Sequence, residues 1–144
     1  MVEISVVIAD QKKATRASYL KQLEPEKGIR VVGEAGGKRE LVKALKLKPR
    51  ILLLDWKIVA LKGSPLLPLV RRHSPQTKVI LLTSRVNPVR LVQALSQGAQ
   101  GYVERTLVRN SLVKAVRLVD GGEVWVSRAL VPLLVAVLSR LALP

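Results

Sequence analysis

The sequence contains no cysteine and no phenylalanine, and its single histidine is His73. A chain without cysteine has no disulfide, no thiolate metal site and no cysteine nucleophile, and one histidine leaves little room for histidine-based metal sites or catalytic triads. The aromatic residues are Trp56, Trp125, Tyr19 and Tyr102. So few rings argue against an aromatic platform for stacking nucleic-acid bases, and the core is expected to be aliphatic.

Long apolar runs are missing as well. No segment reaches the about 18 uncharged apolar residues that a bilayer span requires. The N-terminus, MVEISVVIAD, carries an acid where a signal peptide carries positive charge. With 144 residues, 49% of them hydrophobic and 24% charged, the chain has the size and composition of one globular domain. We therefore expect a cytoplasmic protein without a membrane segment.

Acidic residues are scarce relative to basic ones. The chain has 25 Lys and Arg against 10 Asp and Glu, a formal charge of +15. Such a charge attracts polyanions within a Debye length of roughly 8 Å at physiological salt. Because the basic residues are spread over the whole chain, a basic surface without a specific ligand is an equally open interpretation.

Short aliphatic runs alternate with segments of helical period. Strands are expected at residues 4–9, 29–35, 51–54, 78–83 and 101–103, each followed by a helical pattern, the last of which covers 108–119. This alternation is typical of an α/β fold in which helices cover both faces of a parallel sheet. Ser64-Pro65 and Asn87-Pro88 predict helix N-caps with proline in the first helical position, and Gly98 predicts a helix end.

The last segment, residues 128–144, predicts an extra helix that is apolar almost all round, apart from Ser139 and Arg140. It is too short to span a bilayer. We expect it to pack against the body or against a second copy of the chain, and homodimerisation through it is the favoured outcome. The predicted organisation is a domain over residues 1–127 and an apolar helix over 128–144, with no output domain.

Polar residues follow the predicted strands. Parallel sheets bind ligands at the carboxyl ends of their strands, and the residues found there are Asp10-Gln11, Asp55, Thr83-Ser84 and Glu104-Arg105. A carboxylate nucleophile, a cation and a hydroxyl at one place suit phosphoryl transfer to Asp55. The alternative is that Asp10 and Asp55 are structural acids whose charges are satisfied by Arg105 or Lys57.

Five motifs together carry a family resemblance. They are VVIADQ, VVGEAGG, ILLLDW with Gly63 eight residues after the aspartate, VILLTS and GAQGYVER. Over residues 1–127 the chain resembles the response-regulator receiver domains of two-component signalling, above all those that precede helix-turn-helix output domains. The resemblance implies a doubly wound, flavodoxin-like sheet of five parallel strands in the order 2-1-3-4-5. It also implies a signalling module rather than an enzyme, with a histidine kinase or another signalling protein as partner.

The resemblance assigns roles to individual residues. Asp55 matches the aspartate that accepts the phosphoryl group, and Asp10 matches the first of two acids that hold Mg²⁺ together with it. Thr83 matches the switch hydroxyl and Tyr102 the switch aromatic. Arg105 stands where the family has a lysine, so that the charge is kept while the shape is not.

Three departures from the family pattern concern the metal. Gln11 replaces the second acid, Lys57 stands where a backbone carbonyl completes the metal shell, and Val59 replaces a common proline. Since Mg²⁺ depends on anionic oxygen ligands, we expect weak or absent Mg²⁺ binding and slow phosphorylation. Two alternatives stay open: Lys57 and Arg105 replace the charge of the metal, or an Asp55–Arg105 ion pair holds the switch residues in one state without phosphate.

Two other functions compete with this interpretation. One is nucleic-acid binding through the basic residues of the second predicted helix, which are Lys38, Arg39, Lys43, Lys46 and Lys48. An ordinary solvated helix face has the same pattern, and the chain shows no pair of recognition helices. The other is a hydrolase of the haloacid dehalogenase kind. It requires an aspartate two residues after Asp55, where Lys57 stands.

Overall fold

The computed structural model describes residues 2–59, 66–84, 88–105, 108–126 and 128–142. Its strands are β1 Ile4–Ala9, β2 Ile29–Ala35, β3 Ile51–Asp55, β4 Lys78–Thr83, β5 Gly101–Glu104 and β6 Trp125–Val126. Its helices are α1 Lys13–Leu23, α2 Lys38–Leu45, α3 Trp56–Val59, α4 Leu66–His73, α5 Pro88–Ser96, α6 Val108–Asp120 and α7 Val131–Ala142, the last preceded by a 3₁₀ turn over Arg128–Leu130. In the described part, no helix has the length and apolar character that crossing a membrane requires.

The strands form one parallel sheet in the order β2-β1-β3-β4-β5-β6. The predicted order of the first five strands is confirmed. The sequence did not predict β6, in which Trp125 and Val126 pair with Gly101 and Tyr102, because two residues are too few to show a strand period. The single helical turn of α3 was missed for the same reason.

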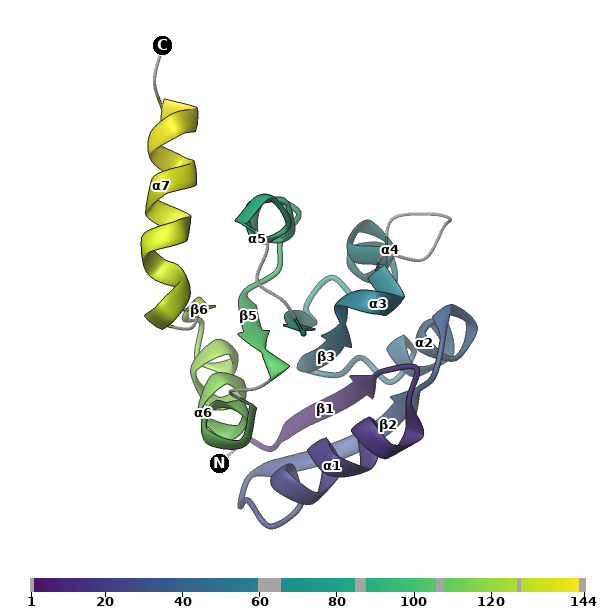
Figure 1. The fold of residues 1–144 in the computed structure, drawn as a ribbon. Coiled ribbons are helices and arrows are strands. Elements are labelled where there is room, and N and C mark those ends of the chain that lie inside the picture. Colours follow the sequence, from purple (N-terminus) through teal and green to yellow (C-terminus); the bar gives the residue numbers. More distant parts are fainter. Residues whose placement is uncertain (1, 60–65, 85–87, 106–107, 127, 143–144) are drawn as a thin grey trace.

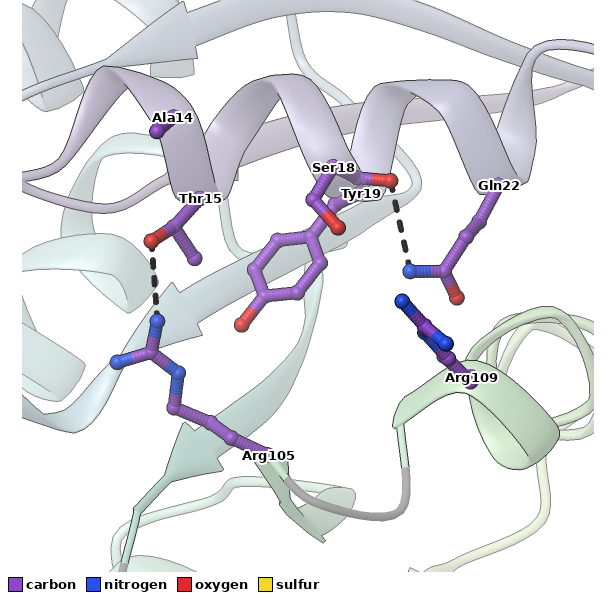
Figure 2. Close-up of a pocket in the computed structure, with 7 residues that line it drawn as sticks. All are labelled: Ala14, Thr15, Ser18, Tyr19, Gln22, Arg105 and Arg109. Carbon is purple, nitrogen blue, oxygen red and sulfur yellow. Dashed lines mark hydrogen bonds between the residues drawn. The ribbon is translucent and has the colours of Figure 1, made fainter.

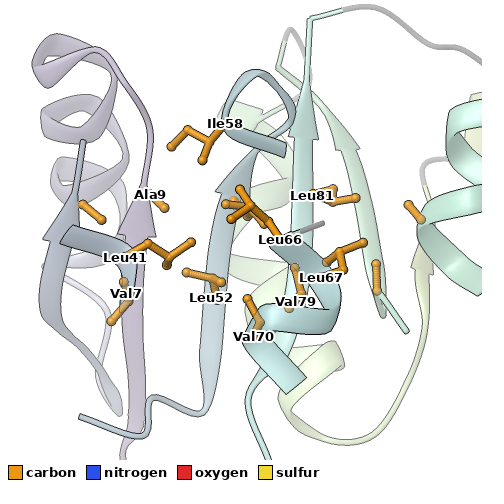
Figure 3. Close-up of a cluster of buried hydrophobic side chains, with 14 of the residues drawn as sticks. Val7, Ala9, Leu41, Leu52, Ile58, Leu66, Leu67, Val70, Val79 and Leu81 are labelled. Carbon is orange, nitrogen blue, oxygen red and sulfur yellow. The ribbon is translucent and has the colours of Figure 1, made fainter. Parts of the chain in front are cut away.

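Helices cover both faces of the sheet (Figure 1). On one face, β-strand residues such as Leu52 and Leu81 pack with apolar side chains of α2, α3, α4 and α5 (Figure 3). On the other face, alternate residues such as Leu53 and Ile80 pack with α1 and α6. Because successive strand residues point to opposite faces, a central strand such as β3 is apolar at every position up to its last residue, Asp55.

Helix ends agree with the sequence where they are described. Gly98 follows α5 with a positive φ of 104° and its N–H donates to the carbonyl of Leu95, as expected for a glycine that ends a helix. The predicted caps Ser64-Pro65 and Asn87 lie outside the described residues, as do Gly63 and Thr106.

The outer strand β2 is irregular. Val6 of β1 pairs with Val31 and Val7 pairs with Gly33, so that Val32 is an extra residue in β2, a β-bulge. Two exposed charged residues, Arg30 and Glu34, lie on the same strand. This edge of the sheet is therefore both bent and charged.

Helix α7 packs against α5 at its base and extends beyond the rest of the domain (Figure 1). Leu130, just before it, is buried, and Leu134 packs against the core. Four other large apolar side chains described in this helix are exposed, among them Val135 at 55% and Leu138 at 50% of their accessible surface. The described part of this helix thus covers the body with one side only and leaves an apolar face uncovered.

Candidate functional site

The sheet brings three of the predicted residues to neighbouring strand ends. Ala9 of β1 pairs with Leu54 of the adjacent strand β3. The next residue in each case, Asp10 just after β1 and Asp55 at the end of β3, therefore lies at the same level of the sheet. Asp55 in turn pairs with Leu82, the residue before Thr83. The predicted cluster of Asp10, Asp55 and Thr83 therefore exists at the carboxyl edge of the sheet.

Both carboxylates are buried, with 1% of Asp10 and 2% of Asp55 accessible. The backbone N–H of Lys12 donates a 2.8 Å hydrogen bond to Oδ1 of Asp10, and the backbone of Lys57 hydrogen-bonds the Asp55 carboxylate. Within the described structure, Oδ2 of each aspartate is buried and has no hydrogen-bond partner. Two buried acceptor oxygens without partners lie at the carboxyl edge of the sheet. Such oxygens are normally satisfied, so this position suits a cation or a hydrogen-bond donor.

Burial raises the pKa of Asp55 above its ordinary value, and the negative charge of Asp10 raises it further. The backbone hydrogen bond from Lys57 and the positive charges of Arg105 and Lys57 lower the pKa but do not cancel the rise. The negative charges of Asp10 and Asp55 thus repel each other, and the nearby positive charges and hydrogen bonds offset only part of this repulsion and of the cost of burial.

Arg105 does not form the predicted ion pair with Asp55. Among the described residues, no ion pair within 4.0 Å joins the two, and Nη2 of Arg105 instead donates a 3.0 Å hydrogen bond to the hydroxyl of Thr15. Thr15 lies in the first turn of α1, which packs on this end of the sheet. The guanidinium therefore acts on Asp55 through its charge alone.

The predicted switch residues both lie inside the domain. Thr83 is 3% exposed at the end of β4, and Tyr102 is completely buried in β5, where it belongs to the same cluster as Leu91 and Ala94 of α5. The ring of Tyr102 thus occupies the inward position in this structure. Its place against α5 links the strand edge to the helix that contacts α7.

The donor set for a divalent cation is reduced. The two orphaned oxygens of Asp10 and Asp55 fit a hard cation such as Mg²⁺. Gln11 is exposed and uncharged, and the side chain of Lys57 is exposed and positive. Among the described residues, no group of three or more acids or histidines converges on one point.

Arg16 is a residue of this site that the sequence pattern did not single out. Its Nη1 donates to the backbone carbonyl of Asp10 at 2.6 Å and lies 3.5 Å from that of Gln11, and its Nε pairs with Glu34 at 3.1 Å. These contacts fix the loop that carries Asp10. No spacing rule predicts the contact with Glu34, because Arg16 lies on α1 and Glu34 on β2.

Trp56 follows Asp55 directly and is half buried, and the guanidinium of Arg90 lies 5.2 Å from the centre of its ring. A cation at this distance interacts favourably with the indole face. Trp56 is thus the direct neighbour of the candidate phosphoacceptor in the chain, and its indole is expected to report on changes of charge at Asp55.

Comparisons with known proteins agree with this geometry. Residues 6–117 match the family model of the response regulator receiver domain. Response regulator protein VraR from Staphylococcus aureus is 31% identical over 121 residues, which are 83% of this chain and 58% of VraR. The chain thus spans little more than half the length of that relative.

Solved receiver structures have the same fold. The isolated receiver domain of RcsB from Salmonella enterica serovar Typhimurium, solved with the phosphomimetic BeF₃⁻, has a TM-score of 0.80 at 27% identity and covers 92% of this chain and 99% of its own. A structure of two RcsB dimers bound to two parallel DNAs has a TM-score of 0.81 at 27% identity, covering 92% of this chain and 68% of that one. The matched family model and the strand-edge aspartates together show that this chain belongs to the response-regulator receiver family of two-component signalling.

Proposed function

We propose that the protein is a cytoplasmic signalling switch that accepts a phosphoryl group on Asp55 from a histidine kinase and passes the change on through protein contacts. It acts as a signalling module and not as a metabolic enzyme. The observation that supports this most directly is the pair of buried carboxylates, Asp10 and Asp55, with Thr83 at the next strand end.

In the transfer step, a carboxylate oxygen of Asp55 forms a bond to phosphorus while the bond from phosphorus to the donor imidazole breaks, and the released imidazole takes up a proton. The backbone N–H of Lys57 is placed to stabilise the negative charge on Asp55. The hydroxyl of Thr83 is the nearest switch group, and Arg105 supplies a positive charge. These groups neutralise part of the charge of the incoming phosphoryl group.

Asp10 and Asp55 are the residues that would hold Mg²⁺, which supplies charge neutralisation for phosphoryl transfer when bound. We propose that this binding is weak. Two unit charges 4 Å apart attract by roughly 4 kcal/mol at an effective dielectric of 20, before desolvation. Replacing an acid by the neutral Gln11 removes one such attraction, and the exposed Lys57 adds a positive charge near the mouth of the site.

Fluorescence of Trp56 tests this function. The experiment uses a Trp125→Phe background, so that the indole beside Asp55 is the only emitter, and titrates Mg²⁺ first alone and then with BeF₃⁻. Weak Mg²⁺ binding above the millimolar range and a fluorescence change with BeF₃⁻, both absent in Asp55→Asn, support the proposal. Tight Mg²⁺ binding that persists in Asp55→Asn, or no response to BeF₃⁻, contradicts it.

Nucleic-acid binding is the second candidate, and the exposed basic face of α2 favours it. Lys38, Arg39, Lys43 and Lys46 are exposed there, while Leu41 and Leu45 are buried against the sheet. Binding through such a face depends on phosphate contacts and weakens steeply with salt. An absent or salt-independent affinity for duplex DNA of random sequence removes this candidate.

A further inference from the structure

A pocket of about 320 Å³ lies between α1 on one side and Arg105, which follows β5, and Arg109 of α6 on the other (Figure 2). Its walls are formed by Ala14, Thr15, Ser18, Tyr19, Gln22, Arg105 and Arg109. None of these described lining residues is acidic. The pocket is therefore a positively charged hollow that also offers hydroxyl and amide groups.

Among the described residues, neither arginine of the pocket forms an ion pair with a carboxylate. The ion pairs of the described residues involve Arg16, Arg30, Arg50 and Arg117, and neither Arg105 nor Arg109. Within the described structure, Arg105 is only partly exposed, donates a hydrogen bond to Thr15 and interacts with the hydroxyl of Tyr19, both of which are neutral groups. A guanidinium has five donors in a fixed geometry that suits oxyanions, and most of these donors have no protein acceptor here.

Arg109 is also on the electrostatically unfavourable end of its helix. It lies in the first turn of α6, where there is no acidic residue. The positive end of the helix dipole disfavours a cation at that position and favours an anion. An anion bound to Arg109 would interact favourably with the helix dipole and so offset the unfavourable interaction of the arginine with it.

Tyr19 gives an independent indication of a ligand. It is 4% exposed, and its buried hydroxyl lies near Arg105 but makes no hydrogen bond of good geometry in the described structure. Burial raises the pKa of the phenol, and the charge of the Arg105 guanidinium, which the hydroxyl faces in Figure 2, and its interaction with the hydroxyl lower that pKa by less. Buried hydroxyls are normally satisfied, and a ligand oxygen between Tyr19 and Arg105 would satisfy both.

The pocket continues into a second hollow along α1. The two share Ala14, Ser18 and Arg109, and the second adds Ala17, Leu20, Lys21 and, just past the end of α1, the acidic Glu24. One end of the combined groove is thus cationic and hydrogen-bonding, and the other is largely apolar. This arrangement fits a small molecule with a charged head and an apolar body.

We propose that this groove binds a small organic phosphate monoester, with the phosphate between Arg105 and Arg109 and the organic part along Ala17 and Leu20. A dianionic phosphate offers three terminal oxygens to donors that approach from α1 on one side and from Arg105 and Arg109 on the other. This inference goes beyond the proposed function and does not depend on phosphorylation of Asp55.

Calorimetric titration of the full chain in phosphate-free buffer tests the proposal. Phenyl phosphate serves as the probe, and inorganic phosphate and benzoate are the comparison ligands. Phenyl phosphate is expected to bind about tenfold more tightly than either one, since only it combines a dianionic head with an apolar body. Equal affinity for inorganic phosphate or benzoate overturns the assignment, as does the absence of binding at millimolar concentration.

Variants locate the binding. Arg109→Ala is expected to raise the dissociation constant about tenfold and Tyr19→Phe about threefold, because each removes a hydrogen bond to a charged group. Arg39→Ala on α2 makes the same charge change on the opposite face and is expected to change it less than about twofold. An equal loss with Arg39→Ala shows diffuse attraction only and overturns the proposal.

Two controls separate this site from the aspartate site and from unfolding. Asp55→Asn is expected to retain phenyl phosphate binding, and its loss in that variant places the ligand at Asp55 instead. Tyr19→Phe is expected to melt at the same temperature as the parent protein or higher without ligand, since it removes an unsatisfied buried hydroxyl. A lower affinity in a variant of unchanged melting temperature therefore reports on binding.

Discussion

Nη2 of Arg105 lies 3.0 Å from the hydroxyl of Thr15, and this hydrogen bond joins the end of β5 to the first turn of α1. The guanidinium is thereby held beside Asp55 without forming an ion pair with it. The position of Arg105 thus depends on a neutral hydroxyl 90 residues away in the chain. Removing that hydroxyl provides a direct test of how Arg105 influences the phosphoacceptor.

Thr15→Val is expected to lower the pKa of Asp55, because the freed guanidinium can approach the carboxylate and a nearby positive charge favours the ionised form. Carboxyl carbon shifts measured by NMR as a function of pH follow this titration. Thr15→Ser retains the hydroxyl and is expected to behave like the parent protein. An unchanged Asp55 titration in Thr15→Val would show that Thr15 does not control Arg105.

Asp55→Asn is expected to stabilise the fold at neutral pH. The pKa of Asp55 is raised in the folded state, so that ionisation favours unfolding, and its cost is complete above the folded pKa. Below the ordinary value of 3.8 both states are protonated and the cost disappears. The variant should gain about 1 kcal/mol in the free energy of unfolding at pH 7, measured with urea, and the gain should shrink toward pH 4.

The test depends on whether Asp55→Asn raises or lowers the free energy of unfolding at neutral pH. Asp120 offers the opposite case, since its carboxylate pairs with Arg50 at 2.7 Å on the surface. Asp120→Asn is therefore expected to leave stability unchanged or to lower it at neutral pH. A loss of stability in Asp55→Asn at pH 7 would mean that the ionised carboxylate is well compensated after all.

Gln11→Asp is expected to strengthen Mg²⁺ binding at least about tenfold, because it adds a negative charge beside Asp10 and Asp55. The fluorescence of Trp56 measures the dissociation constant. Gln76→Asp makes the same change of charge at an exposed position between α4 and β4, on the opposite edge of the sheet. Equal strengthening by both variants would indicate a general charge effect rather than a repaired metal site.

Self-association through the uncovered face of α7 is the fourth prediction. We expect a dimer in which Val135 and Leu138 of two copies meet, because both are exposed and apolar. Leu138→Lys should weaken the dimer about a hundredfold, since each copy loses one buried leucine worth about 1.5 kcal/mol or more. Sedimentation equilibrium measures the association, with Arg140→Ala on the same helix as control. A monomeric parent protein at high concentration would contradict this prediction.

The sequence predicts the strand order and the convergence of Asp10, Asp55 and Thr83, because aliphatic runs define the strands and parallel strands end at one edge. The direction of Arg105 was not predictable, since it depends on how α1 packs against the end of β5. The same is true of Arg16, whose partner Glu34 lies on β2. Patterns of local period determine the elements, whereas contacts of long side chains depend on the assembled structure.

The two outer strands limit the ways in which copies of this protein can associate. The bulge at Val32 interrupts the regular ladder of β2, and the charges of Arg30 and Glu34 lie along it. At the opposite flank, the described part of β6 consists of Trp125 and Val126. A neighbouring molecule therefore finds little backbone with which to extend the sheet. The fold thus resists the edge-to-edge stacking that leads to fibrils and leaves its helices as the surfaces for reversible assembly.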